Sequence, residues 1–125
     1  MGYRSDVGIT ISKHGVDALK TALADKHLDA ELREKINELL SYREIHLIDP
    51  SGTELWVWSD IKWYDFDFTE IAWLMKFLDT LDADEYYYIR LGEDNDDTEI
   101  RGTFWDTPFC MGLVRQINHE RPVAA

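Results

Sequence analysis

The side chains best suited to chemistry are concentrated in one acidic stretch in the second half of the chain. Five carboxylates stand close together there: Glu93, Asp94, Asp96, Asp97 and Glu99. Alternating oxygen ligands open a calcium-binding EF-hand loop, and Asp94, Asp96 and Thr98 would supply the first three. That loop also needs a glycine at its sixth position and a bidentate glutamate at its twelfth, where this chain has Glu99 and Trp105. The spacing therefore does not predict an EF-hand.

Three interpretations of this acidic block remain. It is a solvated hairpin loop, because Asn and Asp tolerate turn geometry, or a patch that engages Lys or Arg of another protein, or a weaker divalent-metal site. We assign no metal ligands and treat the same five carboxylates as candidate partner-binding residues. The sequence alone does not separate charge for recognition from charge for solubility.

Aromatic residues form the second notable group, with five Trp, six Tyr and five Phe. Trp56 and Trp58 alternate with Leu55 and Val57, so in a strand the two tryptophans share one face. They either pack in a small second core covered by residues 109–117 or form an exposed plate of the kind found at interface hot spots. We include Trp56 and Trp58 among the candidate partner-binding residues, and their exposure stays open.

The charge balance limits the classes of partner. The chain has 125 residues and a formal net charge of −12, and residues 49–106 hold sixteen acids and four bases. Such a surface disfavours direct contact with nucleic acid or anionic lipid and favours a partner with a basic surface. The hydrophobic content of 45% predicts a folded domain.

The expected compartment is the cytoplasm. The single cysteine, Cys110, cannot form a disulfide within the chain, which is typical of a reducing compartment. We find neither a membrane-spanning apolar run nor a signal peptide. Motifs for a phosphate loop, a dinucleotide fingerprint or a nucleophile elbow are also missing, so we predict a non-enzyme with no catalytic residue and no cofactor.

Hydrophobic spacing in the first half predicts a strand, a helical crossover and a hairpin. Val7, Ile9 and Ile11 alternate within a strand over residues 3–12, and helical spacing spans about residues 15–41, with Asp29 as a cap. Strands over residues 42–48 and 53–61 flank a type I turn at residues 49–52.

The second half predicts a helix and further strands. A helix over residues 67–81 would start with Asp67 as its cap and Phe66 stapled to Ile71. Strands follow at residues 85–91 and 98–104. Residues 109–117 suit a helix or an edge strand, with strand favoured, and residues 119–125 suit a disordered tail.

This order of elements predicts a single α+β domain over residues 1–118. It matches a ferredoxin-like split β-α-β arrangement with an added C-terminal hairpin. The sheet would be antiparallel or mixed with helices on one face, which leaves the other face open to water or to a partner.

Three short segments are similar to landmarks of small acidic proteins encoded by tailed phages and prophages. They are MGYRSDV at residues 1–7, IKWY at residues 61–64 and IRLGED at residues 89–94, followed by further acids. The resemblance covers the N-terminal strand and about half of residues 56–101. It implies a phage or prophage origin and a bacterial host cytoplasm, and it carries over no catalytic residue. Arg90 could pair with Asp96 or Glu99 across the hairpin.

The leading hypothesis is a non-enzymatic acidic protein that engages or inhibits a basic host or phage protein, for example in a nucleic-acid-handling defence system. Its carboxylates would then stand where phosphates normally bind. One alternative is a small metal-binding domain or enzyme built on the acidic block. Another is a phage structural or assembly protein that oligomerises through its tryptophan face.

Overall fold

The fold is an α+β arrangement of five strands and three helices within the part of the chain that the structure describes. The computed structural model describes residues 3–64, 66–94, 96–105, 107, 109 and 111. Its elements are β1 (Ser5–Ile11), α1 (Lys13–Leu23), α2 (Ala30–Ser41), β2 (Ile45–Ile48), β3 (Glu54–Ile61), α3 (Thr69–Asp79), the 3-10 turn η1 (Ala83–Glu85), β4 (Tyr86–Gly92) and β5 (Thr98–Gly102).

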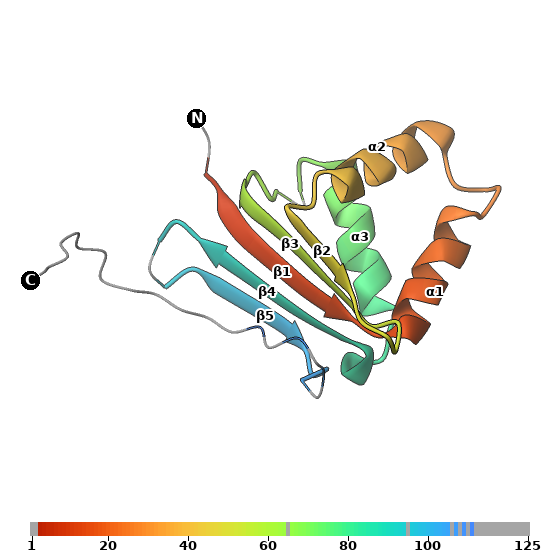
Figure 1. The fold of residues 1–125 in the computed structure, drawn as a ribbon. Helices are drawn as coiled ribbons and strands as arrows, with labels where there is room; N and C mark the ends of the chain where they lie inside the picture. The colour runs from red at the N-terminus through yellow and green to blue at the C-terminus, as the bar shows by residue number, and fades with distance from the viewer. Residues whose placement is uncertain are drawn as a thin grey trace, which may run out of the picture.

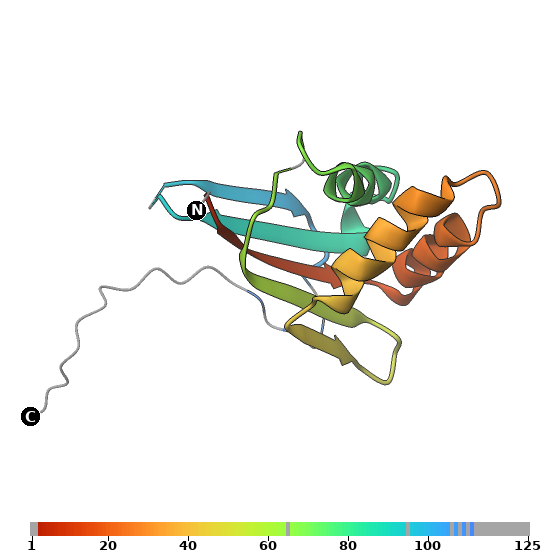
Figure 2. The ribbon, with the colours of Figure 1, turned by 90° about the horizontal axis from the view of Figure 1, so that it is seen from above.

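The sheet has the order β2-β3-β1-β4-β5, and every neighbouring pair is antiparallel. β3 lies between β1 and β2, and β1 lies between β3 and β4, so two split β-α-β units interleave. All three helices cover one face of the sheet (Figures 1 and 2). The ferredoxin-like prediction is confirmed, and the β4–β5 hairpin adds the fifth strand.

The helical crossover is two separate helices with well-defined starts. Ser12 caps α1 by accepting a hydrogen bond from the Gly15 amide, and Asp29 caps α2 by accepting one from Leu32 at 3.0 Å. The predicted Asp29 cap is therefore confirmed. The Arg33 guanidinium on α2 donates to the Leu23 carbonyl at the end of α1 at 2.8 Å, and this hydrogen bond ties the two helices together.

The start of α3 differs from the prediction. The helix begins at Thr69 with Phe68 at the cap position and no side-chain cap, and Asp67 is exposed. Phe66 is 82% exposed and stacks on Tyr64 instead of packing on Ile71. The physical reason is that Phe68 packs against the core, so burial of its ring places the first turn one residue later than the capping pattern indicates.

The main core lies between the sheet and the helices. β1 contributes Val7, Ile9 and Ile11, and the helices contribute Leu19, Leu39, Ile71, Leu74 and Leu78. Trp56 and Trp58 are each 1% exposed and face this core. Neither tryptophan belongs to an exposed plate, nor to a second core covered by residues 109–117.

The β2–β3 hairpin has the predicted turn and the predicted faces. The Gly52 amide donates to the Asp49 carbonyl at 3.0 Å, and the Asp49 carboxylate accepts from the Ser51 and Thr53 amides. Gly52 has φ 90°, which favours glycine. Ile45 pairs with Val57 and Leu47 pairs with Leu55, so these four side chains share the face without helices.

That second face is open only at its edges. Near the C-terminal end of the described residues, Met111 lies over Gly8 so closely that a Cβ there would be 2.5 Å from its sulfur. Trp105 packs edge-on against Tyr87, and Ile89 is buried. Ile45, Leu47 and Ile100 remain exposed at the two sides of the sheet. The expectation of an open face is therefore wrong for its centre.

Two remaining expectations fall mostly beyond this structure. The tail over residues 119–125 lies outside the described residues, and so does most of the strand expected over residues 109–117. Within the described ranges, no helix combines the length and the apolar character needed to cross a membrane.

Candidate functional site

The acidic block forms the loop that joins β4 to β5. The hairpin closes where the Gly92 amide donates to the Asp97 carbonyl at 2.8 Å, and the Asp97 amide donates to the Asp94 carbonyl within the loop. Glu93, Asp94 and Asp96 are exposed on this loop. The loop lies beyond the end of β4, next to the start of β1, because Gly92 pairs with Ser5 (Figure 1).

Asp97 and Glu99 face inward and bind Arg90. The Arg90 guanidinium contacts Asp97 at 2.8 Å and 3.1 Å, Glu99 at 3.3 Å and the Ser5 hydroxyl at 3.2 Å. The hydrogen bonds to Asp97, against the opposing effect of burial, raise the pKa of Arg90 above its ordinary value. The Glu99 pairing is confirmed. The Asp96 pairing is wrong, because closure at Asp97 places that residue beside the strand and Asp96 near the tip of the loop.

Residues just before β1 also form hydrogen bonds with the acidic loop. The Tyr3 hydroxyl donates to Asp97 at 2.6 Å and accepts from the Asp94 amide at 3.0 Å. The Arg4 amide donates to the Glu93 carboxylate at 2.5 Å. The side chains of Asp94 and Asp96 make no hydrogen bond or ion pair with other described residues. These two carboxylates are therefore the ones most available to a partner.

Two further acids lie at the same end of the sheet. A register shift between Ser5 and Val7 marks a bulge where β1 meets the end of β3. At this bulge Asp60 adopts φ 54°, and its amide donates to the Asp6 carboxylate at 2.9 Å. Asp6 and Asp60 are both exposed. We call the group Asp6, Asp60, Glu93, Asp94 and Asp96 the acidic end.

Sequence reasoning did not include Asp6 and Asp60 among the candidates. The two residues are far apart along the chain, and only the pairing of β1 with β3 brings them together. Left-handed backbone at a non-glycine position is most common for Asn and Asp, so Asp60 fits its bulge chemically. An Asp at position 60 is a weak sequence signal for a bulge. Nothing in the sequence predicts that the bulge lies at the same end of the sheet as the acidic loop.

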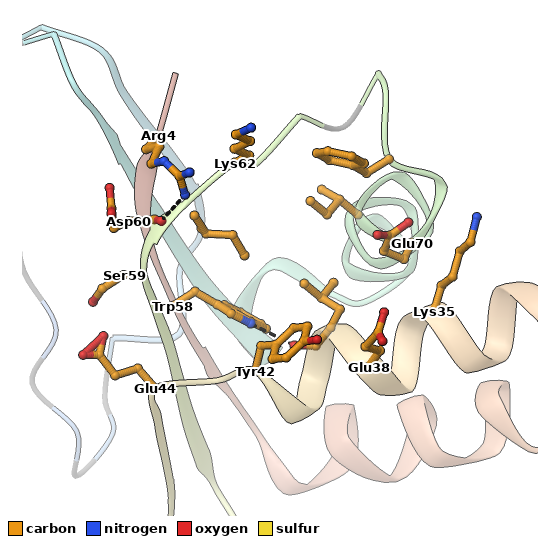
Figure 3. Close-up of a pocket in the computed structure, with 14 residues that line it drawn as sticks. Arg4, Lys35, Glu38, Tyr42, Glu44, Trp58, Ser59, Asp60, Lys62 and Glu70 are labelled. Atoms are coloured by element: carbon orange, nitrogen blue, oxygen red, sulfur yellow. Dashed lines mark hydrogen bonds between the residues drawn. The ribbon is translucent and has the colours of Figure 1, made fainter. Parts of the chain in front are cut away.

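A pocket lies beside the acidic end, between α2, the end of β3 and the start of α3 (Figure 3). Its volume is about 490 Å³. Its apolar lining consists of Leu39, Trp58, Ile61, Phe68 and Ile71, and Tyr42 lies at its lip. Its charged lining consists of Arg4, Lys35, Glu38, Glu44, Asp60, Lys62 and Glu70. We call this the α2–α3 pocket.

A second polar cluster lies behind Arg90, where Tyr88 is fully buried. The Tyr88 hydroxyl is 3.5 Å from the Glu99 carboxylate. Trp63 and Tyr64 line the same depression as Tyr88, Arg90 and Glu99. Burial first, and the negative charge of Glu99 second, raise the pKa of Tyr88 far above its ordinary value of 10.0. The tyrosine therefore stays neutral wherever the protein is folded near neutral pH.

Alkaline solution is expected to destabilise the protein through Tyr88. Its folded pKa lies above its unfolded pKa, so its contribution is complete below about pH 10 and is lost as the pH rises above that value. The free energy of unfolding should fall by up to about 1.4 kcal/mol per pH unit for this one group. Urea unfolding of wild type and Tyr88→Phe between pH 9 and about pH 11.5 would measure the difference. Parallel curves for the two proteins would contradict the assignment.

The metal interpretation finds no support in the geometry of the described residues. No three His, Cys, Asp or Glu side chains among them are arranged so that they could hold one ion. Asp94 and Asp96 are exposed on the loop, and Asp97 is bound to Arg90.

Comparisons with known proteins do not identify the chain. No protein-family model, no curated protein and no solved structure matches it. The features that bear on function are therefore the acidic end, the α2–α3 pocket and the residues that lie between them.

Proposed function

We propose that this is a non-enzymatic acidic binding protein that engages a basic protein surface. In line with the sequence resemblance, it would be encoded by a phage or prophage and act in the cytoplasm of the bacterial host. The partner would be a host or phage protein, for example a component of a nucleic-acid-handling defence system. In that case the carboxylates would occupy a basic groove in place of phosphates.

The observation that carries this proposal is how the acids near the β4–β5 loop divide. Asp97 and Glu99 are held by Arg90 and Arg101, which explains them structurally. Asp94 and Asp96 have no such explanation. They are exposed at the same end of the sheet as Asp6 and Asp60, two acids brought there by the strand pairing. Self-repulsion among exposed carboxylates disfavours the folded state, so a basic partner that relieves it gains binding free energy.

Trp56 and Trp58 do not form an exposed plate on the proposed interface. Both side chains are buried under the helices, and Trp58 also lines the floor of the α2–α3 pocket. The assembly alternative, which relied on a tryptophan face, therefore has no surface to use there. Of the seven candidate residues from the sequence, Glu93, Asp94 and Asp96 remain on the proposed surface.

Neutralising Asp94 and Asp96 together is expected to slow association with a basic partner by about tenfold or more at low salt. The double variant Asp94→Asn/Asp96→Asn is preferable to one that includes Asp97, because Asp97 holds Arg90. Wild type and variant would each be used to capture proteins from a bacterial lysate at about 50 mM salt. Captured proteins would be identified by mass spectrometry and the association rate measured for the purified partner.

The matched control is Asp82→Asn/Asp84→Asn. These two exposed carboxylates lie at η1, beside the start of β4, whereas the acidic loop follows the end of β4 (Figure 1). The control removes the same net charge at the opposite end of the strand. A basic protein that is captured equally by wild type and control but lost in the loop variant supports the proposal. Equal capture by all three proteins, or no basic protein captured at all, would exclude it.

A further inference from the structure

We infer that the α2–α3 pocket is the anchor site of this interface and takes an apolar side chain from an extended segment of the partner. Basic side chains of the same segment would then lie along the acidic end. The inference rests on the proposed function and adds to it the chemistry of the bound segment. Three features of the described residues carry it: the pocket floor, its unpaired charged rim, and a depression that joins the pocket to the acidic loop.

The floor of the pocket is rigid and apolar. Trp58 belongs to the core, and its indole N–H donates to the Leu39 carbonyl at 3.0 Å, which fixes β3 against α2. Ile71 is also buried in the core, where it anchors the first turn of α3. A volume of about 490 Å³ over such a floor accommodates one large aliphatic or aromatic side chain with room for its backbone.

The charged rim is not engaged within the protein. Among the described residues, none of the seven charged side chains that line the pocket forms an ion pair with another described residue; the Arg4 guanidinium donates only to the Asp60 carbonyl. Figure 3 shows Glu38 on α2 and Glu70 at the start of α3 on one side of the opening, with Asp60 and Glu44 on the side of β3. Acids therefore lie on both sides of the apolar floor, and the bases Arg4, Lys35 and Lys62 complete the rim.

A smaller depression continues from the pocket toward the loop. Arg4 and Asp60 line both of them, and the depression is completed by Ser5, Asp6, Leu91, Gly92 and Glu93. Asp60, Asp6 and Glu93 therefore lie between the pocket and the loop, together with Arg4. A ligand with its apolar end in the pocket would meet these three carboxylates and one guanidinium on its way to the loop.

This arrangement specifies the ligand chemistry. An anionic nucleic acid or lipid surface would face repulsion along the path, and a purely apolar ligand would leave the carboxylates unused. An extended peptide with one large apolar residue, and with Lys or Arg residues on one side of it, would fill the apolar pocket and also pair with the carboxylates. Interfaces of this kind bind through a buried anchor, and the charges set orientation and association rate.

A random dodecapeptide display library selected on the full chain tests this inference. Enriched peptides are expected to carry one large apolar residue with Lys or Arg on one side. Glu38→Trp places a ring in the opening between α2 and α3 and should weaken those peptides by about tenfold or more (Figure 3). Glu38→Gln removes the same charge without adding a ring and should weaken them by a clearly smaller factor. Tyr42→Ala removes the exposed lip without filling the pocket and should weaken binding by a smaller factor. Circular dichroism and melting curves would verify that each variant is folded.

The outcomes separate the two proposals. If the enriched peptides bind Glu38→Trp and Tyr42→Ala as tightly as wild type, or if no apolar–basic pattern is enriched, the anchor site is excluded. If a basic partner from the lysate is lost with Asp94→Asn/Asp96→Asn but retained with Glu38→Trp, the anchor site is excluded and the proposed function stands. If neither the loop variant nor the pocket variants change capture, both proposals fail.

Discussion

Replacing Trp58 by alanine is expected to lower the free energy of unfolding by about 4 kcal/mol, within the range for large-to-small changes at buried aromatic residues. Trp58 is 1% exposed, contacts Trp56 and Trp63 through its ring, and donates to the Leu39 carbonyl. The change removes all of these contacts, opens a cavity between β3 and α2, and removes one of the two donors to the Leu39 carbonyl, which keeps the Tyr42 amide. Urea unfolding followed by circular dichroism would measure the loss.

Trp105→Ala is the matched control for this change. Trp105 is 67% exposed and contacts Tyr87 at the edge of its ring. Its removal is expected to cost less than about 1 kcal/mol, as is usual for surface positions. Similar losses for Trp58→Ala and Trp105→Ala would contradict the placement of Trp58 in the core.

Replacing Arg90 by methionine is expected to destabilise the protein by about 3 kcal/mol, the lower end of the range for breaking a buried ion pair. The Arg90 side chain is 17% exposed, and methionine keeps much of its apolar stem while removing the charge. Asp97 and Glu99, two residues apart at the start of β5, would then lose the cation that they share, and Glu99 would keep only Arg101. The lower end of the range applies because both carboxylates are about one-third exposed and water screens them.

A double substitution distinguishes lost pairing from lost packing. In Arg90→Met/Asp97→Asn, position 97 no longer carries a charge that needs Arg90. A substantial part of the stability lost in Arg90→Met should therefore return. Asp96→Asn, on the same loop but outside the cluster, should leave the urea midpoint almost unchanged. If Arg90→Met and Asp96→Asn have the same midpoint, the cluster has no structural role.

The order of elements was predictable because it depends on local patterns. Alternating apolar residues marked β1, the Asp-Pro-Ser-Gly turn fixed the register of β2 against β3, and Asp29 marked the start of α2. The start of α3 was not predictable in the same way. Both a capping pattern at Asp67 and an aromatic residue at Phe68 were present, and tertiary burial of the ring decided between them.

The exposure of Trp56 and Trp58 could not be predicted, although their shared face could. Both faces of β3 are apolar, with Leu55 and Val57 opposite the two tryptophans, so alternation does not say which face the helices cover. The candidate site was partly predictable for a similar reason. The acids of the β4–β5 loop lie close together in sequence, but which of them face Arg90 depends on where the hairpin closes.

The position of β1 constrains how this chain can fold. It is synthesised before the other four described strands and is the central strand of the sheet. Two helices and β2 separate it from its partner β3, and α3 lies between β3 and its other partner β4. Ser5 pairs with both Ile61 and Gly92, so neither edge of β1 is satisfied until those residues have been synthesised. Long-range pairing of this kind slows folding relative to a helical bundle. Val7, Ile9 and Ile11 therefore lack one or both strand neighbours until β4 has been synthesised, and an unpaired apolar strand is prone to aggregation during that interval.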